Sequence, residues 1–327
     1  MGRRVWLATA LGVWVMWVGT GGCATGSVKP VVAERSSGGE RVAETIAWLT
    51  DERLGGRVTG GAEEQATAEW LEAELRGVGW RGAFRFDRAL LTFATEENGH
   101  AVNVCLALEP TAAEAVVLVA HYDGQGVDEA TGEVRPGADD NASGVAAVLE
   151  AARRLAAWGA STETSGGRPV DRTVIVLLTS AEEVGLQGAR VWSALPDAYA
   201  VAKPVAVVNL DMVGRLGDRP LGVYGTETDP GWWGWVGEAS RASGVRVARH
   251  EGFPGSGDHD VFAEVGVPTV LLHTGNHTDR HTPRDTPERV DIDGVARVAE
   301  FTTALVRQLA VAPELAAPPA GASTGVE

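Results

Sequence analysis

The chain has 327 residues, a formal net charge of −16 and only two cysteines, Cys23 and Cys105. The length suits one large α/β domain or two small ones, and the acidity argues against nucleic acid or an anionic membrane surface as a partner. Two cysteines exclude a disulfide framework and a cysteine-type zinc cluster, so with seven histidines any metal site must rely on carboxylates.

The first residues have the pattern of a targeting segment. Arg3 and Arg4 precede an apolar run, residues 5–18, that is too short for a comfortable membrane span. Small residues then lead directly to Cys23, as in a bacterial lipoprotein signal. We therefore expect a signal peptide over residues 1–22 and a cell-envelope lipoprotein anchored through a lipid on Cys23. A plain secretory signal or an uncleaved anchor is the alternative, with the protein then exported to the periplasm or secreted.

Composition divides the rest of the chain into three parts. Residues 23–39 are rich in Ser, Gly and Pro, which predicts a flexible tether. Residues 40–310 carry regular apolar periodicity and are expected to form one domain. Pro and Ala dominate the end of the chain, which predicts a disordered tail over residues 311–327.

Helical and strand-like periodicities alternate along the domain, and a polar surface loop is expected at 159–172. In chain order, the patterns predict helices at 40–49 and 63–76, strands at 83–95, 101–107 and 115–120, a helix at 143–158, a strand at 173–179, a helix at 188–195, a strand at 205–210, a helix at 230–242, a strand at 268–272 and a helix at 293–309. The alternation predicts an α/β fold: a single domain with a mostly parallel, mixed central sheet covered by helices on both faces.

Polar side chains follow four of the predicted strands. His121 comes directly after one strand, and Glu182 and Glu183 come soon after the next. Asp211 follows a third strand, and His281 lies in the loop after a fourth. Because sites in open α/β sheets form at the carboxyl ends of the strands, these side chains are expected to meet at one edge.

Two further carboxylates, Asp139 and Asp140, stand in a Pro/Gly/Asn turn at residues 136–144, just before a predicted helix. Two imidazoles with three or four carboxylates make a zinc-type ligand set. One carboxylate shared by two ions would create a two-metal site, which acidifies a bound water and stabilises a tetrahedral intermediate. In the adjacent pair Glu182 and Glu183, one side chain can hold metal while the other acts as general base.

Six short motifs, in this order along the chain, resemble peptidase family M28, the bacterial leucyl aminopeptidase type of two-zinc exopeptidase. They are His121-Tyr122-Asp123 and residues 137–144, 181–186, 209–212, 257–262 and 281–283. The likeness covers roughly residues 40–309. It implies the fold of a zinc-dependent exopeptidase and implies that residues 40–310 are a zinc peptidase domain.

The resemblance also implies a ligand set for two Zn²⁺ ions. Asp140 would bridge the two ions, although the residues alone do not decide between Asp140 and its neighbour. His121 and Asp211 would complete one ion, and Glu183 and His281 the other. The family places a cis peptide bond directly after the bridging Asp.

Further roles follow from the same resemblance. Glu182 would be the general base and then the proton donor to the leaving amine, and Asp123 would orient His121. Many family members have Tyr just before the last His, as a donor to the developing oxyanion, whereas this chain has Arg280. Arg280 is therefore a candidate oxyanion or substrate contact with a different geometry and charge. Three other histidines, His259, His273 and His277, are expected to have structural or loop roles, not to bind metal.

The predicted function is a zinc-dependent aminopeptidase acting on peptides with a free N-terminus, through a water or hydroxide between the metals with Glu182 as general base. One alternative is a glutaminyl cyclase-like acyltransferase that uses one zinc. Another is a non-catalytic binding protein on the same scaffold. The Asp140 motif and the Glu182–Glu183 pair favour two metals and hydrolysis, and every ligand position is filled. Carboxypeptidase or dipeptidase activity and the preferred first residue stay open.

Overall fold

The computed structural model describes residues 37–96, 99–108, 112–164, 171–195, 202–252 and 255–312. The expected signal peptide, the lipidation site Cys23 and the expected tail beyond residue 312 lie outside these ranges and stay predictions. The first helix begins at Gly38, two residues inside the expected tether. It begins there because Ser37 and Glu40 form a capping box, in which each side chain accepts a hydrogen bond from the other's backbone N–H.

The helices and strands largely alternate, as the sequence predicts. The α-helices are α1 (Gly38–Leu49), α2 (Ala62–Gly77), α3 (Gly144–Thr164), α4 (Gln187–Ser193), α5 (Trp232–Ser243), α6 (Asp258–Glu264) and α7 (Ile292–Val311). The strands are β1 (Arg81–Gly82), β2 (Leu90–Ala94), β3 (His100–Leu108), β4 (Glu114–His121), β5 (Thr173–Thr179), β6 (Lys203–Leu210), β7 (Leu221–Tyr224), β8 (Val247–Arg249) and β9 (Thr269–His273). Within the described ranges, every helix is too short or too polar to span a bilayer.

The strands form one mixed sheet in the order β1-β3-β5-β4-β6-β9-β7-β8, with β2 paired to β3. The central strands β5, β4, β6 and β9 are parallel, and antiparallel pairing begins at β3 on one side and β7 on the other. In the register, His121 pairs with Thr179 and Leu210 pairs with Leu272. The carboxyl ends of the central strands therefore reach the same edge, which is where the polar side chains follow.

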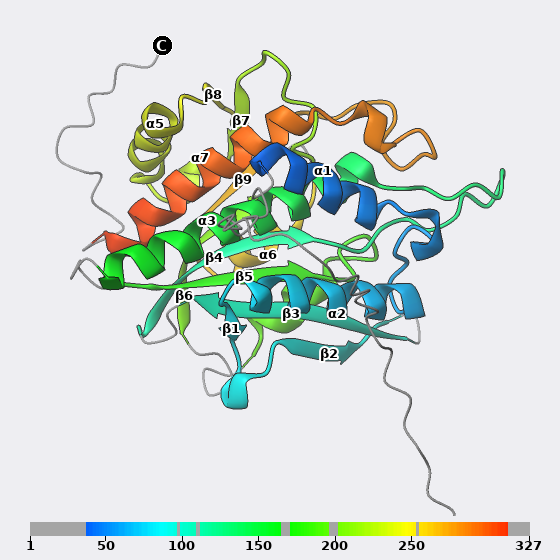
Figure 1. Ribbon diagram of the computed structural model, residues 1–327, viewed down its shortest axis with the longest axis horizontal. Coiled ribbons are helices and arrows are strands. Elements are labelled where there is room, and N and C mark those ends of the chain that lie inside the picture. Colours follow the sequence, from blue (N-terminus) through cyan, green and yellow to red (C-terminus); the bar gives the residue numbers. More distant parts are fainter. Residues whose placement is uncertain are drawn as a thin grey trace, which may run out of the picture. The chain divides into compact units, whose positions relative to one another are not determined.

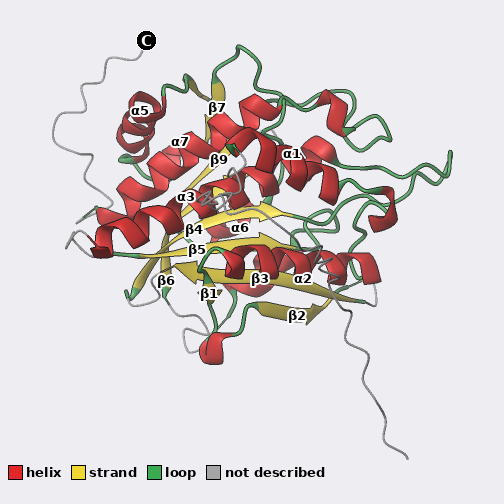
Figure 2. Cartoon of the chain, in the orientation of Figure 1, coloured by secondary structure: helices red, strands yellow, loops and turns green. Residues whose placement is uncertain are grey.

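Helices cover both faces of the sheet, which confirms the predicted fold class. Along β4, Val116, Leu118 and Ala120 pack in the core that α1, α2, α3, α5 and α7 share. The alternate residues Val117 and Val119 pack in a second core with α4 and α6. Figure 1 shows α3 and α7 side by side, and Figure 2 shows the strands between helical layers. This two-sided burial explains why the central strands are continuous apolar runs.

Three expectations about the elements were wrong or incomplete. The strand expected at 83–95 is shortened to β2, because Phe86 and Asp87 adopt left-handed φ angles of 62° and 58° and interrupt it. The loop expected at 159–172 begins later, because α3 continues to Thr164. The glycine at the expected start of the loop, Gly159, does not end the helix, because one glycine costs a packed helix only about 1 kcal/mol. The short elements β7, β8 and α6 had no predicted counterpart.

One buried cation, Arg57, joins three segments beneath the carboxyl edge of the sheet. Its Nε donates to the carbonyl of Tyr122 at 2.8 Å, and its Nη1 donates to the carbonyls of Pro136, at 2.8 Å, and Leu49. Burial lowers the pKa of Arg57 to about 10, against the opposing pull of nearby carboxylates. Arg57 thereby ties the end of α1 and the end of β4 to the turn before Asp140.

We expect Arg57→Met to lower the free energy of unfolding by about 3 kcal/mol, because several buried carbonyls lose their donor. Urea denaturation monitored by circular dichroism measures this change. The matched control is Arg53→Met, since Arg53 is exposed and, among the described residues, its side chain pairs only with Asp51, at 2.7 Å. That control should leave the midpoint of the urea transition nearly unchanged, because an exposed ion pair contributes little to stability. Equal effects of the two substitutions would contradict the role assigned to Arg57.

Candidate metal centre

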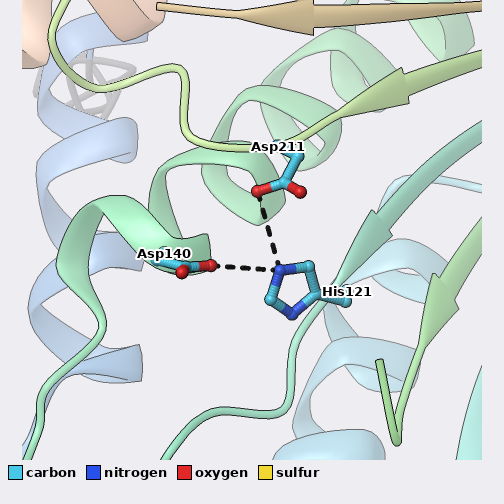
Figure 3. Close-up of side chains that lie close together, drawn as sticks. All are labelled: His121, Asp140 and Asp211. Atoms are coloured by element: carbon cyan, nitrogen blue, oxygen red, sulfur yellow. Dashed lines mark ion pairs between the residues drawn. The ribbon is translucent and has the colours of Figure 1, made fainter. Parts of the chain in front are cut away.

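A first group of ligand-type side chains gathers around the end of β4. The Nε2 atom of His121 lies 3.2 Å from Oδ1 of Asp140 and 3.7 Å from Oδ1 of Asp211. Figure 3 shows both carboxylates directed at the same imidazole nitrogen. The three ligand atoms come from β4, from the turn before α3 and from the end of β6, and they lie within 4.8 Å of one another.

A second group uses the other oxygen of the same aspartate. Oδ2 of Asp140 lies 3.0 Å from Nε2 of His281, and that nitrogen lies 3.2 Å from Oε2 of Glu183. Asp140 therefore has one carboxylate oxygen in each group. Asp139, by contrast, belongs to neither group. The two carboxylates that the sequence left undecided thus point in different directions.

The chemistry of these side chains fits metal ions. Several buried atoms find no hydrogen-bond partner among the described residues: both ring nitrogens of His121, Nε2 of His281, Oδ1 of Asp211 and Oε1 of Glu183. Leaving a buried polar atom unpaired costs about 1–3 kcal/mol, so such atoms need a partner from outside the protein. Imidazole nitrogens with carboxylate oxygens form a ligand set suited to zinc.

Burial and neighbouring charges shift the pKa values of two carboxyl groups in opposite directions. Although burial opposes ionisation, His121 and His281 hold the pKa of Asp140 well below its ordinary value. Burial, reinforced by the charge of Asp211, raises the pKa of Glu182 well above its ordinary value. Its Oε2 lies 4.0 Å from Nε2 of His121. A carboxyl group with a raised pKa beside a ligand cluster is a candidate proton carrier.

Asp123 connects the two strands that deliver His121 and the glutamate pair. Its carboxylate oxygens accept hydrogen bonds from the backbone N–H groups of Glu182 and Glu183, each at 3.2 Å. Oδ1 also lies 3.6 Å from Nδ1 of His121, and Thr59 Oγ1 donates to Oδ2 at 3.0 Å. Asp123 therefore fixes the backbone of the glutamate pair as well as facing the histidine. Thr59 was not predicted from the sequence, because nothing in its loop marks it.

Hydrogen bonds within the protein also hold the turn that carries Asp140. The cis peptide implied by the family resemblance is present between Asp140 and Asn141. The Asn141 side chain donates to the carbonyl of Leu210, at 3.0 Å, and accepts from the N–H of Met212, at 3.2 Å. Asp285 accepts from the N–H of Asp140 at 3.0 Å. Sequence reasoning missed Asp285, which lies in a loop with no motif of its own.

The neighbouring Asp139 has a structural position. It accepts hydrogen bonds from Ser143 Oγ, at 2.9 Å, and from the N–H of Gly214, at 2.6 Å. Its Oδ2 lies 2.9 Å from Nε2 of His277, whose Nδ1 accepts from the N–H of Asp279. His277 is thus a loop residue, as expected, and it links the loop carrying His281 to the Asp140 turn.

Arg280 and the backbone near the ligands show two features of the site that periodicity does not reveal. Nε of Arg280 donates to Oδ2 of Asp140 at 2.9 Å, so this side chain reaches the shared carboxylate. Ala181 precedes the glutamate pair, Met212 follows Asp211 and His281 is itself a candidate ligand, and these three residues adopt left-handed φ angles of 58°, 52° and 58°. Such conformations are costly for residues other than glycine and concentrate at functional sites.

Comparison with known proteins agrees with this geometry. Residues 103–306, more than half of the chain, match the sequence model of peptidase family M28. Aminopeptidase YwaD of Bacillus subtilis (strain 168) is 29% identical over 161 residues, which are 47% of this chain and 30% of that relative. The chain therefore matches about a third of the length of this curated relative.

Solved structures resemble the fold. The Legionella pneumophila LapA aminopeptidase superposes with a TM-score of 0.68 at 20% identity, over 84% of this chain and 73% of that one. A glutaminyl cyclase of Porphyromonas gingivalis gives 0.66 at 23% identity, over 83% of this chain and 98% of that one. The fold is thus common to enzymes of two activities. Because the family model covers the strands and loops that deliver the ligand groups, the chain belongs to peptidase family M28.

Proposed function

We propose that the protein is a zinc-dependent aminopeptidase that removes N-terminal residues from peptides. The observation that carries this proposal is Asp140, whose two carboxylate oxygens lie 3.2 Å and 3.0 Å from the imidazoles of His121 and His281. One carboxylate with an oxygen in each of two ligand groups suits a pair of ions that share a ligand. Membership of a peptidase family supports hydrolysis.

In this proposal the ligands divide into two sets. His121 and Asp211 would hold one ion and Glu183 and His281 would hold the other, with Asp140 common to both. Bound zinc would supply Lewis acidity, which lowers the pKa of a water and polarises the carbonyl of the scissile peptide bond. Apart from Nδ1 of His121, which faces Asp123, the buried, unpaired atoms of these side chains would be available to the ions.

In this proposal, Glu182 transfers a proton from the attacking water to the departing amine. Its buried carboxyl group has a raised pKa and stands 4.0 Å from the imidazole of His121, beside both ligand groups. It takes a proton from the attacking water and holds it while the tetrahedral intermediate forms. It then gives the proton to the nitrogen of the departing amine. A positioned carboxyl group of this kind accelerates such a reaction by about 10²–10⁴-fold.

Asp123 would position both His121 and the backbone of the glutamate pair. We expect Asp123→Asn to weaken zinc affinity by about 10–100-fold, because the amide can accept only one of the two N–H bonds. Competition with a chelator of known affinity measures the change. The control is Asp218→Asn, at an exposed position. Unchanged zinc affinity in Asp123→Asn would contradict this role.

A glutaminyl cyclase-like acyltransferase with one zinc is the second candidate, and one observation favours it. The Arg280 guanidinium donates to Oδ2 of Asp140, the oxygen that faces His281. This cation stands close to the position of a second ion and competes for the same oxygen. The similarity of the fold to glutaminyl cyclases is compatible with this candidate.

One panel of substrates separates the candidates. The zinc-loaded protein is assayed with amino-acid p-nitroanilides, with their N-acetylated forms and with a peptide that begins with glutamine. The aminopeptidase proposal predicts release of p-nitroaniline from the free amines only, abolished by a chelator and restored by zinc. Formation of a pyroglutamyl peptide without hydrolysis would favour the cyclase, and turnover of the acetylated substrates would indicate a different peptidase specificity.

A further inference from the structure

A small polar pocket adjoins the candidate metal centre. Its volume is about 60 Å³, and its lining includes Asp211, Ser256, His259, His273 and Arg280. Pockets for drug-sized ligands measure roughly 300–1,000 Å³ and are mostly apolar. This pocket therefore suits a small polar group, and it shares Asp211 with the first ligand group.

One hydrogen-bond donor in the lining is neutral and buried. His273, at the end of β9, is 4% exposed, and its Nδ1 accepts from the N–H of Gly275 at 2.7 Å. In the neutral ring the proton then sits on Nε2, which makes that nitrogen a donor. Tyr224 lies edge-on to the ring, with 6.2 Å between the ring centroids. His273 thus presents a fixed donor and no positive charge.

Arg280 supplies the positive charge. Its Nε donates to Asp140, while its two terminal nitrogens make no hydrogen bond within the described parts of the chain. A guanidinium has its donors in a planar fork that matches both oxygens of a carboxylate. The acidic lining residue is Asp211, whose carboxylate belongs to the ligand group around His121. The other polar side chains of the lining are Ser256, His259 and Asn276.

We propose that this pocket binds a carboxylate of the substrate, namely the side chain of an N-terminal Asp or Glu. The proposal rests on the proposed aminopeptidase function. The carbonyl under attack belongs to the first residue of the substrate, so the side chain of that residue begins next to the candidate metal centre. The pocket shares Asp211 with the first ligand group of that centre. An apolar side chain would instead offer the guanidinium of Arg280 and the imidazole of His273 no acceptor, which disfavours leucine-type substrates.

The test compares substrates that differ in one charge. With wild-type protein, kcat/KM for aspartyl p-nitroanilide should exceed that for the asparaginyl compound by about 10–100-fold, the range of a hydrogen bond to a charged group. Arg280→Met should remove this preference, so that the ratio of kcat/KM for the aspartyl compound to that for the asparaginyl and leucyl compounds falls, mainly through KM, even where loss of the bond to Asp140 alters all three rates together. Arg280→Lys should keep part of it, because the charge stays and the fork is lost. The control is Arg284→Met, an exposed arginine of the same loop that pairs with Asp279.

Two kinetic results would overturn the proposal. An equal loss of kcat on all three substrates in Arg280→Met, with the aspartyl preference unchanged, would place Arg280 at the reacting carbonyl, not in the pocket. A preference for Leu-Gly over Leu-Gly amide that disappears in Arg280→Met would show that the pocket holds the α-carboxylate of a dipeptide. Each differs from failure of the proposed function, in which no substrate is hydrolysed.

Binding tests the pocket without turnover. In calorimetry with zinc-loaded protein, L-aspartate should bind at least about tenfold more tightly than L-asparagine, and Arg280→Met should abolish the difference. Equal binding of the two amino acids would overturn the proposal even if the enzyme were active. Selective binding of L-aspartate would uphold it even if the p-nitroanilides were not hydrolysed.

Discussion

The Glu182→Gln variant should hydrolyse aminoacyl p-nitroanilides about 10²–10⁴-fold more slowly than the wild-type protein, with the loss in kcat. Glutamine has nearly the same shape but cannot carry the proton. The backbone N–H of residue 182 still bonds to Asp123, so the glutamate pair keeps its position. Because Glu182 is not assigned as a ligand, the zinc content should stay unchanged. Steady-state kinetics and metal analysis of the same sample measure both quantities.

The adjacent residue provides the matched control. Glu183→Gln should lose zinc as well as activity, because Oε2 of Glu183 faces His281 at 3.2 Å in the second ligand group. The two neighbouring substitutions therefore separate proton transfer from metal binding. If Glu182→Gln retained a tenth or more of the wild-type rate, or lost zinc as Glu183→Gln does, the assignment of the general base would be wrong.

Asp140→Asn should have the other largest effect, because it alters both ligand groups together. The amide keeps one oxygen and places an NH₂ group where the other oxygen stood, so one of the two imidazoles faces a donor in place of an acceptor. Loss of an outer-sphere partner typically weakens metal binding by about 10–100-fold, and the loss of a shared ligand should exceed that. Metal analysis after dialysis should find zinc depleted from both positions and activity lost with it.

Asp139→Asn is the control for this prediction. Asp139 is as buried as its neighbour, but it bonds to Ser143 and Gly214 and lies outside both ligand groups. Its substitution should lower the free energy of unfolding by about 1–3 kcal/mol while zinc affinity changes little. Loss of zinc in Asp139→Asn with retention in Asp140→Asn would reverse the assignment of the shared carboxylate.

The central strands and the edge of the sheet that carries the site could be predicted from the sequence, because both depend on short, local patterns. The buried central strands are continuous apolar runs, and a polar residue follows each of them, so the edge of the sheet that carries His121, Asp211 and the glutamates could be predicted. The strand register then aligns His121 with Thr179. Which oxygen of Asp140 faces which imidazole depends on side-chain direction, which no spacing in the sequence encodes.

The supporting contacts could not be predicted for a related reason. Arg57, Thr59 and Asp285 lie in loops, where no periodicity marks a buried residue, and each acts on a segment distant in the sequence. The left-handed conformations at Ala181 and Met212 are imposed by the surrounding structure against the preference of those residues. The short strands and α6 depend on pairing and packing with neighbours, which a window of sequence does not contain.

We infer that two ions share Asp140 and serve peptide hydrolysis. The most direct test is a titration of metal-free protein with zinc, in which bound zinc per chain and hydrolysis of an aminoacyl p-nitroanilide are measured on the same samples. We expect binding to saturate at two ions per chain and full activity to require the second. Saturation at one ion, with cyclisation of an N-terminal glutamine and no hydrolysis, would contradict the claim.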